Sequence, residues 1–297
     1  MNCELIKLRI KKIIIIAASM FLIFSMILTS SCGAKGADII IAGSTSVQPY
    51  AEMLAGLYES THPGIKIEVQ GGGSSAGIQA VESGTANIGM SSRALKEAEE
   101  YLWSIEIAKD GLAIIIHPDN SIIKLEYDEN NVLVPVADLT LEQVRKIYTG
   151  EITNWSELGG HDAKIHVSTR EEGSGTRSAF EDLVMDKNRI TSKAIVQDSN
   201  GSIRQFVSDD VYSIGYISLG LVNPERGQKE VKDVRLDGVK AEEENIINHS
   251  YKLYRSFLFV TLDEPEGLIK EFIDFVLSPE SQQLLENEGL IPIKKTE

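Results

Sequence analysis

The sequence has only two cysteines and fewer basic than acidic residues, and both shortages exclude classes of protein. Cys3 and Cys32 supply neither a disulfide framework nor a four-thiolate zinc site, so a hydrophobic core must hold the fold together. With 29 Lys and Arg against 44 Asp and Glu, the net charge is −15, and the chain lacks the basic footprint of a nucleic-acid binder. An apolar content of 42% excludes a disordered chain, and 297 residues favour two domains over one.

The N-terminus has the pattern of an export signal. Positive charges precede an apolar run at residues 13–28, and small or hydroxylated residues lead from there to Cys32. The positive residues are Lys7, Arg9, Lys11 and Lys12. The run of 16 residues is shorter than the roughly 17–25 that a membrane-spanning helix needs, which favours a signal sequence. We predict a lipoprotein signal peptide at residues 1–31, lipidation of Cys32 and an anchor linker at 32–37.

Lipidation predicts an extracytoplasmic protein that is anchored to the cell membrane. Lipoprotein sites usually have Leu three places before the cysteine, whereas this chain has Thr29 there, so a plain signal peptide and an uncleaved anchor stay open. A single acyl chain such as palmitate binds membranes only marginally, so stable anchoring needs more than one. Cleavage before Cys32 removes four positive charges and Glu4, which changes the net charge from −15 to −18.

After the signal, β-branched runs alternate with helical patterns. Strands are predicted at 39–41, 65–69, 86–90, 112–116, 164–169, 213–219 and 254–261. Helices are predicted at 47–57, 78–84, 95–107, 139–150, 177–185, 267–277 and 279–288. This alternation predicts an α/β fold with a mainly parallel sheet. Residues 119–131 are polar and are interpreted as a crossing between two domains, and 223–248 are assigned only as polar and exposed.

Four turns rich in Gly, Ser and Thr lie between a predicted strand and the segment that follows it. They are Gly43–Ser46, Gly71–Ser75, Ser91–Ser92 and Gly173–Thr176. Each combines free backbone N–H groups, hydroxyls and the positive end of a helix, which together suit an anion. Helix capping explains any single turn equally well. Because the carboxyl ends of parallel strands meet at one edge of a sheet, the four turns together favour an anion site.

Arg170 leads from a predicted strand into the turn of sequence REEGSGT. Its planar fork of donors can hold two oxygens of one tetrahedral oxyanion, whereas a lysine acts more as a point charge. We interpret Arg170 as the charged anchor of the site. The alternative is a surface arginine paired with Glu171 or Glu172, and such a pair could also orient the fork for binding.

Five segments together resemble the phosphate-binding proteins of bacterial ABC phosphate transporters. In chain order they read AGSTSVQPYAE, QGGGSSAGIQAV, NIGMSSRALK, YTGEITNWSELGG and REEGSGTRSAF, and they follow the lipoprotein signal. The resemblance covers the whole mature chain. It implies a periplasmic-binding-protein-like fold of type II, in which inorganic phosphate is held in the cleft between two lobes. The implied lobes are residues 38–117 with 255–297, and 118–254.

The resemblance also implies the residues that bind phosphate. Those carried over to this sequence are Thr45, Ser46, Ser74, Ser92, Arg170, Ser174, Gly175 and Thr176, with Glu172 orienting the arginine. Several family members have Asp at the position of Ser92, where it accepts a proton from phosphate and rejects sulfate. A serine hydroxyl donates or accepts. In this chain, sulfate rejection must therefore rest on other acceptors or be weaker.

The implied protein is a receptor rather than an enzyme, with permease subunits of an ABC phosphate transporter as partners. We expect a monomer without a cofactor or metal, and we interpret His161 and His166 as ordinary surface or loop histidines and Trp155 as a packing residue. Another oxyanion such as sulfate, molybdate or phosphonate stays open as the ligand, and so does a role as adhesin or phosphate sensor. A remote alternative is a serine hydrolase, because residues 73–77 read G-x-S-x-G around Ser75.

Overall fold

The computed structural model describes residues 37–127, 133–222 and 230–293. The predicted signal peptide, Cys32 and the anchor linker up to residue 36 lie outside the described residues. In the described ranges, no helix is long and apolar enough to cross a membrane. The described residues form one compact unit.

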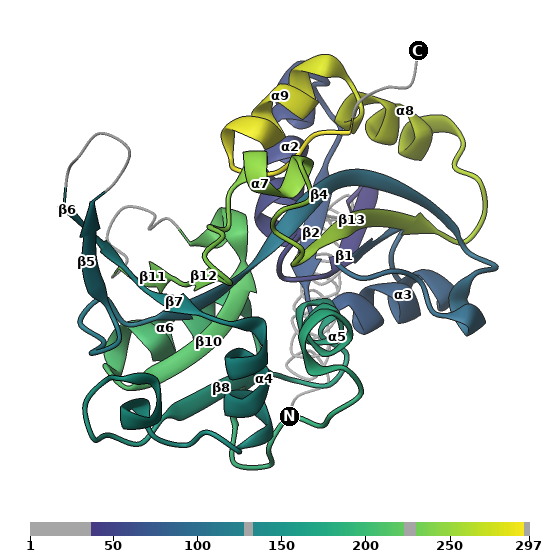
Figure 1. The fold of residues 1–297 in the computed structure, drawn as a ribbon. Coiled ribbons are helices and arrows are strands. Elements are labelled where there is room, and N and C mark those ends of the chain that lie inside the picture. Colours follow the sequence, from purple (N-terminus) through teal and green to yellow (C-terminus); the bar gives the residue numbers. More distant parts are fainter. Residues whose placement is uncertain (1–36, 128–132, 223–229, 294–297) are drawn as a thin grey trace, which may run out of the picture. The chain divides into compact units, whose positions relative to one another are not determined.

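The backbone of this unit is a sheet of nine strands in the order β2-β1-β3-β13-β4-β10-β8-β9, with β11 also paired to β4 (Figure 1). The strands are β1 (Ile39–Gly43), β2 (Ile67–Gly71), β3 (Ile88–Ser91), β4 (Trp103–Ile116), β8 (His166–Arg170), β9 (Ile195–Gln197), β10 (Ser213–Ser218), β11 (Lys232–Asp233) and β13 (Tyr254–Thr261). Two small sheets pair β5 (Lys124–Tyr127) with β6 (Leu133–Val136), and β7 (Asp138–Leu139) with β12 (Arg235–Leu236).

The helices cover this sheet. They are α2 (Gln48–Thr61), α3 (Ser74–Glu82), α4 (Leu141–Thr149), α5 (Gly175–Phe180), α6 (Asn200–Asp209), α7 (Glu243–Ile247), α8 (Gly267–Val276) and α9 (Pro279–Asn287). Helix α2 packs on β1 and β2, α3 on β1 and β3, and both α5 and α6 on β8 and β10. Local sequence sets the helix ends. At the start of α4, Thr140 Oγ1 accepts from Gln143 N at 3.1 Å and Gln143 Oε1 accepts from Thr140 N at 2.8 Å, which is a capping box.

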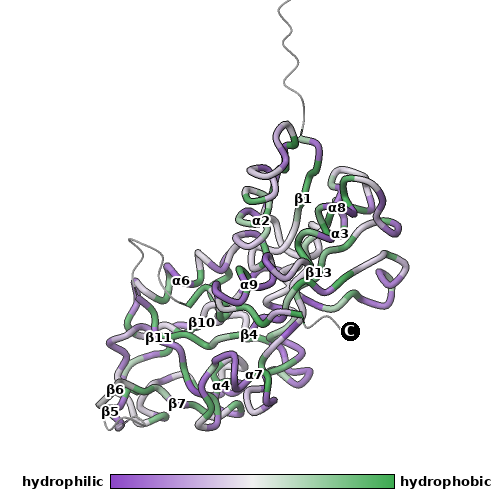
Figure 2. The backbone as a smooth tube through the Cα atoms, turned by 90° about the horizontal axis from the view of Figure 1, so that it is seen from above, coloured by the Kyte–Doolittle hydropathy of each residue, from purple (hydrophilic) through white to green (hydrophobic). Residues whose placement is uncertain are grey.

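Two hydrophobic clusters define two lobes, and β4 runs from one to the other (Figure 1). The first lobe contains β1, β2, β3 and β13, with a core that includes Ile41 and Phe259. The second contains β8, β9 and β10, with a core that includes Trp155 and Tyr216. Figure 2 shows that hydrophobic residues follow β4 where it lies beside β10. The lobe boundaries at residues 117 and 254 stay predictions, because β4 continues without a break between the clusters.

The predicted α/β fold is confirmed, with four corrections. The sheet is mixed rather than mainly parallel, because β13 runs antiparallel to β3 and β4, and β4 runs antiparallel to β10. The helix predicted at 95–107 is wrong: only a short 3₁₀ turn forms at Glu97–Glu99 before β4 begins. Sequence reasoning missed α6 and α7 altogether, since α6 is rich in polar residues and α7 is short. Its assignment of 223–248 as exposed is also wrong for Val234 and Ile246, which are buried.

Gly77 gives a test of the contact between α3 and β1. A Cβ at Gly77 would lie 2.5 Å from the Ala42 carbonyl oxygen and 2.7 Å from Gly43 Cα, both rigid backbone atoms. We expect Gly77→Ala to lower the free energy of unfolding by about 1–3 kcal/mol, the usual cost of overpacking. Urea denaturation measures this change.

The matched control is Gly56→Ala in α2, where an added Cβ meets nothing within 4 Å. Because alanine is the better helix former, we expect that variant to gain about 0.5–1 kcal/mol. Equal effects of the two substitutions would contradict the close packing of α3 on β1.

Candidate anion-binding site

The four Gly, Ser and Thr turns meet where the two lobes face each other. Ser44–Ser46 follow β1, Ser74 opens α3 after β2, and Ser92 follows β3. In the second lobe, Gly173–Thr176 connect β8 to α5. All four turns therefore lie at the carboxyl ends of strands, where α/β sheets carry their ligand sites.

Hydroxyl groups of the first lobe form one buried chain. Ser44 Oγ donates to Ser92 Oγ at 2.7 Å, and Ser92 Oγ lies 3.3 Å from Ser74 Oγ. The Ser92 backbone N–H also donates to Ser74 Oγ at 3.0 Å. These three serines are at most 2% exposed, so each depends on its neighbours for hydrogen bonds.

Residues of the second lobe contact the turns that carry these serines. Ser46 Oγ lies 2.8 Å from Thr176 Oγ1, and the Ser75 N–H donates to the Gly173 carbonyl at 3.1 Å. A Cβ on Gly175 would lie 2.2 Å from Ser74 Oγ, so glycine is needed for the contact. Ser174 caps α5, with its Oγ accepting from Arg177 N at 3.3 Å.

Arg170 is the charged centre of the site. It ends β8 and is 1% exposed, and its Nη2 donates to Thr45 Oγ1 at 3.2 Å across the lobes. Its backbone N–H donates to the hydroxyl of Tyr216 at 3.2 Å, and burial raises the pKa of that phenol to about 12. The second terminal nitrogen, Nη1, is buried and has no hydrogen-bond partner among the described residues.

The carboxylate that holds Arg170 is Glu171, and the predicted orienting role of Glu172 is corrected accordingly. Arg170 Nε and Nη2 each donate to Glu171 at 2.8 Å. Glu172 is exposed. Glu181, with a smaller contribution from the charge of Glu172, raises the pKa of Arg177. Because β8 ends at Arg170 and the chain turns there, spacing along the sequence does not tell which of two consecutive carboxylates faces the arginine.

All eight predicted ligand residues lie in this cluster, and their role in binding stays a prediction. Sequence reasoning missed two further residues, Asn200 and Arg255. Asn200 Nδ2 donates to Ser46 Oγ at 2.9 Å, and Arg255 Nη2 donates to the same oxygen at 3.0 Å. The sequence does mark Asn200, because Ser199 and Asn200 form another polar turn between a strand and a helix. No sequence pattern marks Arg255, which lies inside β13.

Ser75, the nucleophile of the hydrolase alternative, is bonded to an arginine. Arg93 Nη2 donates to Ser75 Oγ at 3.3 Å, and Arg93 itself is held by Glu99 at 2.7 and 2.8 Å. A guanidinium only donates, so it cannot remove a proton from the serine. This partner weighs against the hydrolase reading.

The histidines considered as metal ligands, His161 and His166, belong to no cluster of metal-binding side chains among the described residues. Within 37–127, 133–222 and 230–293, no group of three or more His, Cys, Asp or Glu could hold a metal ion. His166 Nδ1 lies 2.6 Å from Asp210, and Trp155 is buried in the second core with its Nε1 donating to the Tyr212 carbonyl at 2.9 Å. The interpretation of Trp155 as a packing residue is confirmed.

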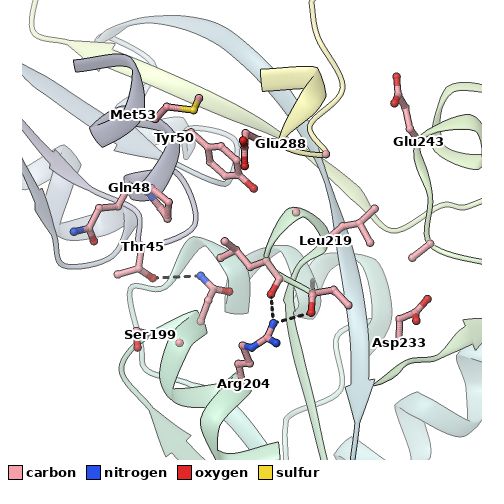
Figure 3. A pocket seen from close by; sticks show the side chains of 18 of the residues that line it. Thr45, Gln48, Tyr50, Met53, Ser199, Arg204, Leu219, Asp233, Glu243 and Glu288 are labelled. Atoms are coloured by element: carbon pink, nitrogen blue, oxygen red, sulfur yellow. Dashed lines mark hydrogen bonds between the residues drawn. The ribbon is translucent and has the colours of Figure 1, made fainter. Parts of the chain in front are cut away.

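A cavity of about 1240 Å³ adjoins the cluster at Thr45 (Figure 3). Glu243 and Glu288 also line it, and Glu288 lies beside Tyr50. Burial raises the pKa of Glu243, and the nearby charge of Glu286 adds to that shift. The acidic residues that line this cavity outnumber the basic ones, which disfavours an anion, so the cluster around Arg170 is the candidate anion site.

Comparison with known proteins identifies the family. A family model described as a PBP superfamily domain matches residues 29–280. The phosphate-binding protein PstS of Bacillus subtilis is 30% identical over 275 residues, covering 89% of this chain and 85% of that protein. PstS of Borreliella burgdorferi is 29% identical over 295 residues, covering 96% of this chain and 99% of that protein.

Solved structures agree with these relatives. A substrate-binding protein from Clostridium perfringens, solved with bound phosphate, is 43% identical with a TM-score of 0.77, covering 86% of this chain and 99% of that one. An ABC-type phosphate transport receptor from Vibrio cholerae is 37% identical with a TM-score of 0.67, covering 86% and 100%. Since the family model and these relatives span most of the chain, it belongs to the PBP superfamily and, within it, to the family of the phosphate-binding proteins PstS.

Proposed function

We propose that this chain is an extracytoplasmic receptor that binds inorganic phosphate between its two lobes and delivers it to an ABC importer. Two kinds of support converge on this function. The relatives are named for phosphate binding, and the Clostridium perfringens protein was solved with phosphate. Independently, an arginine and hydroxyl groups of both lobes lie in one hydrogen-bonded cluster, which supports the same function.

The unpartnered Nη1 of Arg170 is the observation that carries the proposal. A buried donor without an acceptor costs roughly 1–3 kcal/mol, and more when it is charged. Glu171 occupies the Nε and Nη2 side of the fork, so the free N–H groups face away from that carboxylate. An oxyanion bound next to Nη1 satisfies them.

Neutral donors complete the coordination. Thr45, Ser46 and Ser74 come from the first lobe, and Ser174 and Thr176 come from the second. An anion held by both sets bridges the lobes and stabilises the closed arrangement through contacts that the open one lacks. The acidic net charge of −15 does not oppose this, since exposed charges are screened over about 8 Å in physiological salt.

Phosphate keeps at least one proton at neutral pH, so its site needs an acceptor as well as donors. The hydroxyls of Ser74 and Ser92 serve that purpose, because a serine donates or accepts. They discriminate less sharply than a carboxylate at position 92 would, so sulfate, molybdate and phosphonate remain the competing ligands to test.

The cellular setting is also a proposal. A signal at 1–31 and lipidation of Cys32 would hold a monomeric receptor at the outer face of the cell membrane, beside the permease subunits that take up its ligand. Neither a cofactor nor a metal is needed for this role.

Removal of the charged anchor tests the ligand site. We expect Arg170→Ala to weaken phosphate binding at least about tenfold, because charge-assisted hydrogen bonds are the strong ones. Calorimetric titration of the chain from Gly33, unfolded and refolded to remove carried-over ligand, measures the affinity. Circular dichroism verifies that the fold is intact.

Arg235→Ala is the matched control, since Arg235 is partly exposed and pairs with Glu126 at the surface. Its phosphate affinity should equal that of the wild type. Unchanged affinity in Arg170→Ala would remove this site from consideration. Sulfate is titrated in parallel, and equal binding of both anions would make the chain a broader oxyanion receptor.

Substitution of the predicted acylated cysteine tests the anchor. We expect the full-length wild type to fractionate with membranes when expressed in a bacterium, and Cys32→Ser to lose the lipid mass on its mature N-terminus. Cys3→Ser is the control, because Cys3 lies in the predicted signal and should leave lipidation intact. Mass spectrometry of the mature N-terminus decides the question, and an unmodified wild-type Cys32 would refute the anchor.

A further inference from the structure

The hydroxyl of Ser46 lies between two nitrogen donors that sequence reasoning did not find. Asn200 Nδ2, at the start of α6, lies 2.9 Å from Ser46 Oγ, and Arg255 Nη2, on β13, lies 3.0 Å from it. Ser46 is completely buried, so water does not compete for this oxygen. Its third neighbour is Thr176 Oγ1, at 2.8 Å.

These contacts fix the direction of the Ser46 hydroxyl. An amide NH₂ and a guanidinium donate and never accept, so Asn200 and Arg255 occupy both lone pairs of Ser46 Oγ. The Ser46 proton must then point at its remaining neighbour, Thr176 Oγ1, or at a ligand that takes this place. Toward Thr176 or a ligand, the Ser46 hydroxyl therefore acts only as a hydrogen-bond donor.

Both nitrogen donors are themselves held in orientation. Asn200 Oδ1 accepts from the Ser218 backbone N–H at 3.3 Å, and because that group only donates, the amide nitrogen must face Ser46. Arg255 Nε and Nη2 donate to Asp110 at 3.1 and 2.9 Å, and Ser218 Oγ donates to the other oxygen of Asp110 at 2.6 Å. Three strands, β4, β10 and β13, supply this support.

The Thr45 hydroxyl also faces two nitrogen donors, at longer distances. Its Oγ1 accepts from Arg170 Nη2 at 3.2 Å and lies 3.4 Å from Asn200 Nδ2. Figure 3 draws the contact of Thr45 as a dashed line at the edge of the cavity. A single amide thus reaches two of the three hydroxyls of the first turn, those of Thr45 and Ser46.

We propose that Asn200 and Arg255 are positioning residues that hold Ser46, and Asn200 also Thr45, as obligatory hydrogen-bond donors to the bound anion. This inference rests on the proposed phosphate site and adds a division of labour within it. Ser46 and Thr45 face oxygens without a proton, and the protonated oxygen of phosphate lies toward Ser74 and Ser92. Asn200 acts through these hydroxyls and does not contact the anion. Arg255 acts on Ser46 through its Nη2, while its buried Nη1 has no hydrogen-bond partner among the described residues.

A mutant cycle separates positioning from direct contact. We expect Asn200→Ala to weaken phosphate binding by about tenfold in the otherwise wild-type chain, because freed hydroxyls lose their fixed direction. In a background that lacks both hydroxyls, Thr45→Val with Ser46→Ala, the same substitution should change affinity less than about twofold. Equilibrium dialysis with radiolabelled phosphate measures all four chains.

Two controls guard against trivial explanations. Asn188→Ala removes an amide that bonds to the Met185 carbonyl, outside the anion cluster, and should leave affinity unchanged. Asn200→Asp keeps the acceptor for Ser218 but replaces the donor by a carboxylate that takes the hydroxyl protons, so it should fold and bind at least about tenfold more weakly than Asn200→Ala.

Each outcome decides the inference. A tenfold loss that persists without the two hydroxyls would show that Asn200 contacts the anion and would overturn the positioning role. Wild-type affinity in Asn200→Ala would overturn it as well. A wild-type chain that binds no phosphate would instead refute the proposed function, and the inference with it.

Discussion

The arrangement of the two lobes depends on one constraint, the burial of the Arg170 guanidinium. A guanidinium does not lose its charge in a protein, so every N–H group removed from water needs an acceptor. Glu171, Thr45 and the Asp198 carbonyl satisfy part of the fork, and Nη1 has no partner among the described residues. At 1% exposure, this nitrogen is a buried, charged donor without an acceptor, which is why we propose an anion beside it.

The strands and turns of both lobes bring hydroxyl groups close to the Arg170 guanidinium. Strands β1, β2, β3 and β8 end at the same place, and their turns carry hydroxyls in place of larger side chains. Glycine allows the approach at Gly175, where any Cβ would collide with Ser74. Beneath these turns, Asp110 and Arg255 form a second buried pair, in which burial raises the pKa of Asp110 while Arg255 opposes the shift.

Sequence reasoning found most residues of the candidate site because their signals are local. Turns of Gly, Ser and Thr between strand and helix, and an arginine at a strand end, are visible in short segments, and the structure gathers Thr45, Ser74 and Thr176 from them. Contacts that depend on tertiary packing were not visible. Nothing local marks Arg255 on β13 as a partner of Ser46, and the choice of Glu171 over Glu172 depends on where β8 ends. The helix predicted at 95–107 failed because the alternation in β4 begins inside it.

The most direct test of the central claim is a crystal structure of the refolded chain with phosphate. The account predicts one phosphate between the lobes, with an oxygen within hydrogen-bond distance of Arg170 Nη1 and further bonds to Ser46 and Thr176 that replace their mutual contact. A phosphate bound instead in the cavity beyond Thr45, or an Arg170 whose Nη1 bonds to protein alone, would contradict it.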